Sequence, residues 1–146
     1  MIPTLTTARL TLRAPQMADF PAYSAFLASP RSKGVDGPLN TKAAWAYFTH
    51  DCALWHLAGH GSLMIVRRDT GALAGSISLN AGPMFDEVEL GWMVYDGHTN
   101  MGLCHRSRRR LARLGLGHAV PADTGQLCRH RQRPLAPGCR KAGGGD

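Results

Sequence analysis

The chain has 146 residues, about the size of one ordinary domain, and a formal net charge of +7 at pH 7. It has neither a run of about 18 apolar residues nor a basic segment followed by a long apolar one near its start, so we expect no membrane span and no secretory signal. Its four cysteines are too widely spaced for a disulfide framework, and we expect a reduced, cytoplasmic protein.

The charge is divided unevenly along the chain. Residues 1–102 hold 7 Lys and Arg against 8 Asp and Glu, whereas residues 103–146 hold 10 against 2. All ten aromatic residues lie at or before Tyr95. A segment without Phe, Tyr, Trp or Ile has little apolar surface with which to offset the entropy of folding. We therefore divide the chain into a domain portion, residues 1–102, and a basic tail, residues 103–146, which we expect to be poorly ordered.

The first predicted elements are a strand and a helix. Leu10 and Leu12 alternate with polar residues, which predicts a strand. Asp19 is placed to cap a helix over residues 20–27, and Ser29-Pro30 stops that helix.

A second helix is predicted after a loop rich in Gly and Pro. Asn40 or Thr41 can cap it, and Gly59 is expected to end it. The residues predicted to turn inward are Ala44, Trp45, Phe48 and Leu54.

Three strands complete the domain portion. Residues 61–68 and 73–80 are predicted to form a hairpin around a tight turn at residues 69–71, and residues 88–95 form a further strand. The order of strand, helix, helix and three strands implies a mixed α/β domain.

Several short strings between residues 4 and 102 occur in an order typical of one family. They are Thr7-Ala8-Arg9-Leu10-Thr11-Leu12-Arg13, Arg31-Ser32, Gly37-Pro38 with Ala44-Trp45, Asp69-Thr70-Gly71 with Gly75, and Glu89-Leu90-Gly91-Trp92 with Gly97-His98. Together they resemble the GNAT superfamily, in the branch that includes ribosomal-protein-alanine acetyltransferases. The resemblance implies the GNAT acyl-CoA N-acyltransferase fold, α/β with a mixed sheet, whose C-terminal part is missing or non-native here. It also implies transfer of acetyl from acetyl-CoA to a primary amine, either a protein N-terminus or a small amine.

The resemblance implies two contacts with acetyl-CoA. The backbone of one strand faces the pantetheine arm, and a glycine-rich loop that opens a helix holds the pyrophosphate through its N–H groups. The residues that match the strand are Trp92, Met93 and Val94, and those that match the loop are Thr99, Asn100, Met101 and Gly102. Thr99 stands where the family has Gln or Arg, and the helix expected after the loop is absent from the sequence.

Glu89 is the candidate general base. The resemblance implies a carboxylate in this strand that deprotonates the amine through a water molecule. Two alternatives remain open, since Glu89 could be a strand residue paired across the sheet and its neighbour Glu87 could be the base instead.

Neither the histidines nor the cysteines predict a metal site. His56 and His60 have the spacing of two ligands on one helix face, but Gly59 interrupts the helix and no Glu or Cys completes the set. We expect these histidines to be surface or structural residues. Cys104-His105 and Cys128 with His130 do not have the spacing of a zinc finger.

The basic tail suggests a reading-frame error. One choice of codons for Met101-Gly102-Leu103-Cys104-His105 is ATG GGG CTA TGC CAC, and deletion of one G from it gives a frame that reads Met-Gly-Tyr-Ala. Continued with GC-rich codons, that frame gives the end of the phosphate loop, an Ala-rich helix, a strand and a late helix, in the order of the family. Our hypothesis is that one extra nucleotide near Gly102 displaced the frame.

Two other readings remain. The chain could be a nonfunctional frameshifted product, or a basic protein that binds nucleic acid through its Arg-rich tail. We expect no specific nucleic-acid partner and no membrane partner, and the sequence does not indicate an oligomeric state.

Overall fold

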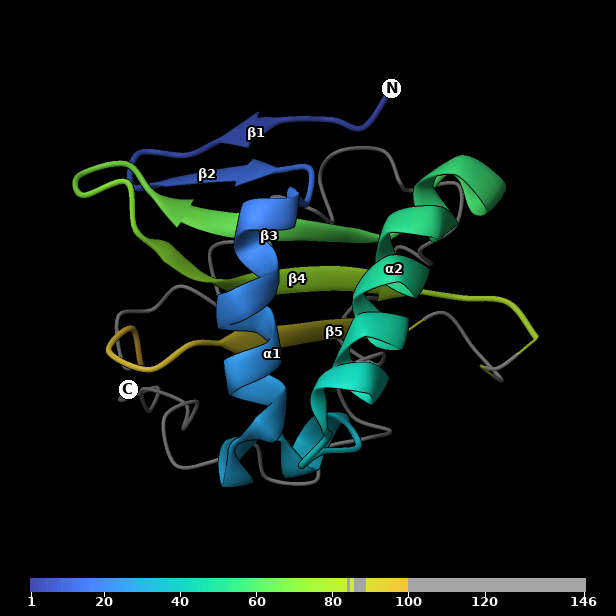
Figure 1. The fold of residues 1–146 in the computed structure, drawn as a ribbon. Coiled ribbons are helices and arrows are strands. Elements are labelled where there is room, and N and C mark those ends of the chain that lie inside the picture. The colour runs from blue at the N-terminus through green and yellow to red at the C-terminus, as the bar shows by residue number, and fades with distance from the viewer. Residues whose placement is uncertain (84, 86–88, 100–146) are drawn as a thin grey trace, which may run out of the picture.

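One sheet with two helices on one face makes up the protein over residues 1–83, 85 and 89–99, which the computed structural model describes (Figure 1). Five strands lie in the spatial order β1-β2-β3-β4-β5, each antiparallel to its neighbours. They are β1 (Leu5–Thr6), β2 (Leu10–Arg13), β3 (Ser62–Arg67), β4 (Leu73–Asn80) and β5 (Glu89–Val94). The predicted mixed α/β class is confirmed, and the expected basic tail lies outside the described residues.

Helix α1 (Phe20–Ala28) has nearly the bounds that its sequence predicts, and Tyr23, Phe26 and Leu27 are buried. The predicted cap is wrong in its chemistry. The side chain of Asp19 makes no cap bond to α1, because both of its oxygens bind the Arg13 guanidinium at 2.8 Å. A short 3₁₀ turn, η1 (Met17–Asp19), leads into α1, and another, η2 (Pro30–Val35), follows it.

Helix α2 (Thr41–Ala58) begins at Asn40, whose Oδ1 accepts the N–H of Ala43 at 2.9 Å, and ends at Gly59 with a φ of 72°. The prediction that Trp45 points inward is wrong, because 42% of its surface is exposed and its ring lies edge-on to that of Phe20. Trp55 is buried instead.

None of the helices in the described part has both the length and the apolarity that crossing a bilayer requires.

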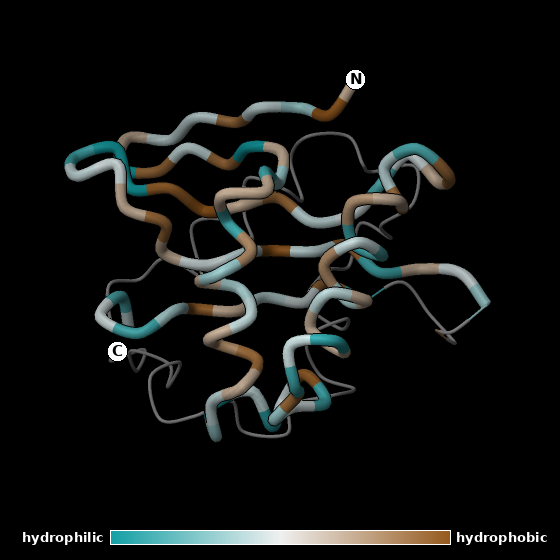
Figure 2. Tube along the Cα trace, in the orientation of Figure 1, coloured by the Kyte–Doolittle hydropathy of each residue, from teal (hydrophilic) through white to brown (hydrophobic). Residues whose placement is uncertain are grey.

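The β3–β4 hairpin has the predicted form. Strand β4 has the predicted bounds, β3 is two residues shorter than predicted, and the turn between them uses Gly71 at a φ of 71°. Figure 2 shows hydrophilic residues at this turn and hydrophobic stretches along the strands that it joins.

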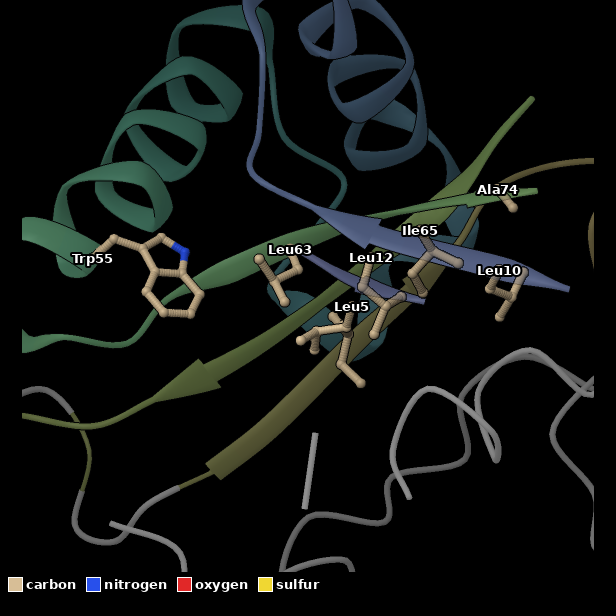
Figure 3. Close-up of a cluster of buried hydrophobic side chains, with 8 residues drawn as sticks. Leu5, Leu10, Leu12, Trp55, Leu63, Ile65 and Ala74 are labelled. Atoms are coloured by element: carbon tan, nitrogen blue, oxygen red, sulfur yellow. The ribbon is translucent and has the colours of Figure 1, made fainter. Parts of the chain in front are cut away.

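Each face of the sheet carries its own hydrophobic cluster. The helix-facing cluster lies between the sheet and the two helices and consists of Tyr23, Phe26, Leu27, Ala44, Phe48, Met64, Met93 and Tyr95. Successive strand residues point to opposite faces, and the second cluster therefore lies on the other side of the sheet (Figure 3). Its members are Leu5, Leu10, Leu12, Trp55, Leu63, Ile65, Ala74 and Ile77, with Leu90 and Trp92 packed against them.

Candidate active site

One edge of β5 carries backbone groups that point away from β4. The N–H of Tyr95 donates to the oxygen of Ala74 on β4 at 2.9 Å. In a trans peptide the C=O points opposite to the N–H, so the oxygen of Val94 faces away from β4. Because hydrogen-bonded and non-hydrogen-bonded pairs alternate in an antiparallel ladder, the backbone groups of Leu90, Trp92 and Val94 share this direction. We call this side the free edge of β5, since no described strand pairs with it.

The three residues predicted to face the pantetheine arm divide between two directions. Trp92 and Val94 present their N–H groups at the free edge. The backbone of Met93 is directed to Ser76 on β4, and its side chain, 8% exposed, lies in the helix-facing cluster. The indole of Trp92 packs half-buried on the opposite face of the sheet.

The predicted phosphate loop lies mostly outside the described residues. Thr99 is described and exposed. The remaining loop positions, Asn100, Met101 and Gly102, are not described. The chain reaches Thr99 through a turn at Asp96-Gly97, in which the N–H of His98 donates to the oxygen of Tyr95 at 3.2 Å.

Glu89 lies at the start of β5, on the sheet face that the helices cover. It is half-buried, directly opposite Asn80 of β4, and on the same face as Gly91 and Met93. Because β5 begins on the side of α2 (Figure 1), Glu89 is at the end of the strand nearer that helix. The alternative base, Glu87, is outside the described residues.

The absence of a side chain at Gly91 makes room beside Glu89. A Cβ at this position would lie 2.9 Å from Ser78 Oγ and 3.3 Å from Asn80 Nδ2. The polar ends of Ser78 and Asn80 therefore converge over Gly91. A carboxylate, a hydroxyl and an amide on one patch of the sheet can bind an amine and a water molecule.

A polar pair joins the two helices, with Tyr23 buried and Asp51 half-buried. The hydroxyl of Tyr23 on α1 donates to Asp51 on α2 at 2.8 Å. Burial raises the pKa of Asp51 above its ordinary value, although the bond from Tyr23 opposes the shift. Burial also raises the pKa of Tyr23 and of Tyr95.

The sequence interpretation missed Asp51, although its position carries a signal. Asp51 follows Ala44 and Phe48 on the inward stripe of α2 at the helical period. A charged residue on such a stripe must be paired or hydrogen-bonded, or must change its pKa.

The two histidines with the spacing of metal ligands have a structural and a surface position. His60 is buried, and its Nδ1 lies 2.9 Å from the oxygen of Leu79. His56 is exposed on the last turn of α2. Among the residues that the structure describes, no group of His, Cys, Asp and Glu has the geometry of a metal site.

Comparison with known proteins identifies the family. The model of the acetyltransferase (GNAT) domain matches residues 9–131, whereas a comparison with curated proteins gives no match. The chain is similar to the solved acetyltransferase from Agrobacterium tumefaciens strain C58, with 42% identity and a TM-score of 0.74 over 96% of this chain and 90% of that one. A putative GNAT-family acetyltransferase from Bordetella pertussis is 25% identical, with a TM-score of 0.61 over 75% and 70%.

A third solved structure is similar in fold. It is RimL, the ribosomal L7/L12 α-N-protein acetyltransferase, in complex with coenzyme A, at 20% identity and a TM-score of 0.60 over 77% of this chain and 70% of that one. The family match covers most of the chain, and it includes both β5 and the patch around Glu89. By this match, the chain belongs to the GNAT family of acetyltransferases.

Proposed function

We propose that this gene encodes an N-acetyltransferase that transfers acetyl from acetyl-CoA to a primary amine, with Glu89 as the general base. The observation that carries the proposal is the position of Glu89 directly before Leu90, the first residue of β5 whose backbone groups point to the free edge. The N–H groups of Trp92 and Val94 lie along that edge, and Glu89 lies on the adjoining helix-facing surface.

The free edge fits the pantetheine arm of acetyl-CoA. An extended chain of amide groups can bind a strand edge as an added strand would, through alternating donors and acceptors. The N–H groups of Trp92 and Val94 are the donors, and the oxygen of Trp92 is an acceptor. Support also comes from RimL, whose structure contains coenzyme A.

The chemistry requires a neutral amine beside an activated acyl group. Acetyl-CoA, when bound, supplies the acyl group as a thioester. Glu89 accepts the proton of the amine through a water molecule, and Asn80 and Ser78 orient that amine over Gly91. The amine nitrogen attacks the thioester carbon, and a backbone N–H at the free edge stabilises negative charge that develops on the acyl oxygen. The C–S bond then breaks, and coenzyme A leaves as a thiolate that takes a proton from solvent.

The acceptor is an amine of a protein N-terminus or of a small molecule. RimL acts on the α-amine of ribosomal L7/L12, which supports the first class. Assays with a panel of peptide N-termini and of small primary amines separate the two classes by kcat/KM.

We further propose that residues 103–146 are read out of frame and that the chain as translated is impaired. The change in charge and aromatic content after residue 102 supports this. The family match runs past Gly102 to residue 131, so the test must be made on the DNA and on the protein product. We call the product of the gene with one G removed at Gly102 the frame-restored chain.

Resequencing across the Gly102 codon tests the frame, and calorimetry tests the function. We expect acetyl-CoA to bind the frame-restored chain and to bind the 146-residue chain weakly or not at all. If neither chain binds acetyl-CoA, the proposed activity is wrong. If the 146-residue chain binds as tightly as the frame-restored one, the proposed impairment is wrong, and RNA binding that discriminates sequence would favour a role for the basic tail instead.

A further inference from the structure

Arg31 joins the segment after α1 to the end of β5. It is the second residue of η2, and its Nη2 donates to the backbone oxygen of Val94 at 2.8 Å. Its Nη1 donates to the carboxylate of Asp96, two residues beyond. The guanidinium carbon also lies 5.5 Å from the ring centre of Phe26, which in turn packs against Tyr95.

The contact with Val94 is at the free edge of β5. The oxygen of Val94 faces away from β4, because the N–H of the same peptide group is bound to Ala74. Arg31 therefore occupies the last acceptor of the edge, and within the described part of the chain no group binds the oxygens of Leu90 and Trp92. A positive charge thus stands where the free edge ends.

The geometry of these contacts requires an arginine. The planar guanidinium donates in two directions and stacks on an aromatic ring at the same time, whereas the ammonium of lysine is a point charge on a flexible stem. The ion pair with Asp96 contributes little by itself, because the carboxylate is 83% exposed. The charged hydrogen bond to Val94 and the contact with Phe26 involve less exposed groups and carry most of the interaction.

The residues that Arg31 binds control how the chain leaves the strand. Asp96 and Gly97 make the turn that follows β5, with Gly97 at a φ of 81°, and Thr99 is two residues further. Fixing both Val94 and Asp96 sets the direction in which the backbone approaches the predicted phosphate loop.

We propose that Arg31 is a positioning residue for acetyl-CoA. It ends the run of edge groups that the pantetheine arm can use, and it holds the turn that leads to the phosphate loop. The inference rests on the proposed function, because that function assigns the pantetheine arm to the free edge and the pyrophosphate to the loop. Arg31 acts on cofactor binding and not on the deprotonation of the amine, which takes place at the other end of β5.

The first experiment uses the frame-restored chain and its Arg31→Lys and Arg31→Ala variants. We expect KM for acetyl-CoA, and its Kd by calorimetry, to rise about tenfold or more, while kcat and KM for the amine change less than about twofold. Arg68→Ala is the matched control, because Arg68 also donates to a backbone oxygen, that of Thr7 at 3.0 Å, but far from β5. It should leave all these constants unchanged.

The second experiment uses the 146-residue chain. Amide hydrogen exchange of Tyr95 and His98 should accelerate at least tenfold in Arg31→Ala and not in Arg68→Ala. If the parent frame-restored chain binds and turns over acetyl-CoA while the Arg31 variants match it, or lose only kcat, the role of Arg31 is wrong and the proposed function stands. If the parent itself neither binds nor turns over acetyl-CoA, both fall together.

Discussion

Glu89 of β5 and Asn80 of β4 lie directly opposite each other on the face of the sheet that the helices cover. This pairing places a carboxylate beside an amide at the start of β5, two residues before Gly91, which lies on the same face. If Glu89 is the general base, removal of its charge must slow turnover without weakening the binding of acetyl-CoA.

We therefore expect Glu89→Gln to lower kcat of the frame-restored chain by about 100-fold or more, because general-base catalysis contributes about that much. KM for acetyl-CoA should change less than about twofold. Steady-state kinetics with both substrates varied measure this. Glu87→Gln is the matched control, and a larger loss in that variant would transfer the role to Glu87.

Two glycines of the sheet predict different results when changed to alanine. A Cβ at Gly75 would lie 2.1 Å from the backbone oxygen of Met93, which cannot move aside without distorting β5. We expect Gly75→Ala to lower the free energy of unfolding by about 2 to 3 kcal/mol, as in other overpacked cores. Urea unfolding of the 146-residue chain, followed by tryptophan fluorescence, measures the loss.

Gly91→Ala meets only the ends of side chains, Ser78 Oγ and Asn80 Nδ2. We expect it to cost less than about 1 kcal/mol, because those ends can rotate away. In the frame-restored chain it should nevertheless raise KM for the amine severalfold, since the two polar groups leave their positions. Equal destabilisation by both alanines would contradict this account.

The Tyr23–Asp51 pair predicts a dependence of stability on pH. Because burial raises the pKa of Asp51, the folded state holds a proton that the unfolded state has already lost. Stability from this group is complete below the ordinary aspartate pKa and decreases as the pH rises through the raised value. Asp51→Asn has no carboxyl to titrate, so the variant does not lose stability as the pH rises, and its amide oxygen still accepts from Tyr23. The free energy of unfolding of the variant, relative to that of the parent, should therefore increase from acid to neutral pH.

Tyr23→Phe should have the opposite effect. It removes the donor to Asp51 and should destabilise the chain more at neutral pH, where the carboxylate needs that donor, than at acid pH. Thermal unfolding at several pH values measures both variants. Tyr47→Phe is the control, because that exposed tyrosine donates to Asp36 on the surface. A flat pH profile for Tyr23→Phe relative to the parent would contradict the role of the pair.

The Arg13–Asp19 pair should be the most costly ion pair to break among those of the described residues. Asp19 is 3% exposed, binds the guanidinium through both oxygens and also accepts the N–H of Gln16 at 2.7 Å. Asp19→Ala leaves Arg13 without its partner, and we expect it to lower the free energy of unfolding by about 2 to 3 kcal/mol. Asp69→Ala, in an exposed pair with Arg67, should leave the unfolding midpoint nearly unchanged.

The sequence was informative where a local pattern and a local stop signal coincide. Strand β4 has the predicted bounds because its apolar residues run from the turn at Gly71 to the polar Asn80. Helix α2 ends at Gly59 as predicted, because glycine takes the left-handed conformation at little cost. Neither depends on residues far away in the chain.

The sequence could also have predicted that Trp55, and not Trp45, is the buried tryptophan of α2. Ala44, Phe48 and Trp55 follow the helical period, whereas Trp45 is one residue out of phase with Ala44. An aromatic ring at the edge of a stripe can nevertheless pack on a neighbour, as Trp45 does on Phe20.

Several contacts near the site join residues that are far apart in the sequence, so no local pattern predicts them. Tyr23 and Asp51 are 28 positions apart, and Arg31 and Val94 are 63 apart. The carboxylate of Asp19 is close to the helix terminus that the sequence assigns it, yet Arg13 competes for it with a charged, two-pronged bond. Tertiary partners decide such cases.

The strand order of this sheet repeats the order of the chain, β1-β2-β3-β4-β5. During synthesis each new strand therefore adds to a partner that has already left the ribosome, and no described strand has to wait for a later one. The part of the chain up to Tyr95 can form as soon as it is made, whichever frame is read afterwards. A change downstream would then leave a folded domain that ends in an open strand edge, and such an edge invites a second molecule to pair with it.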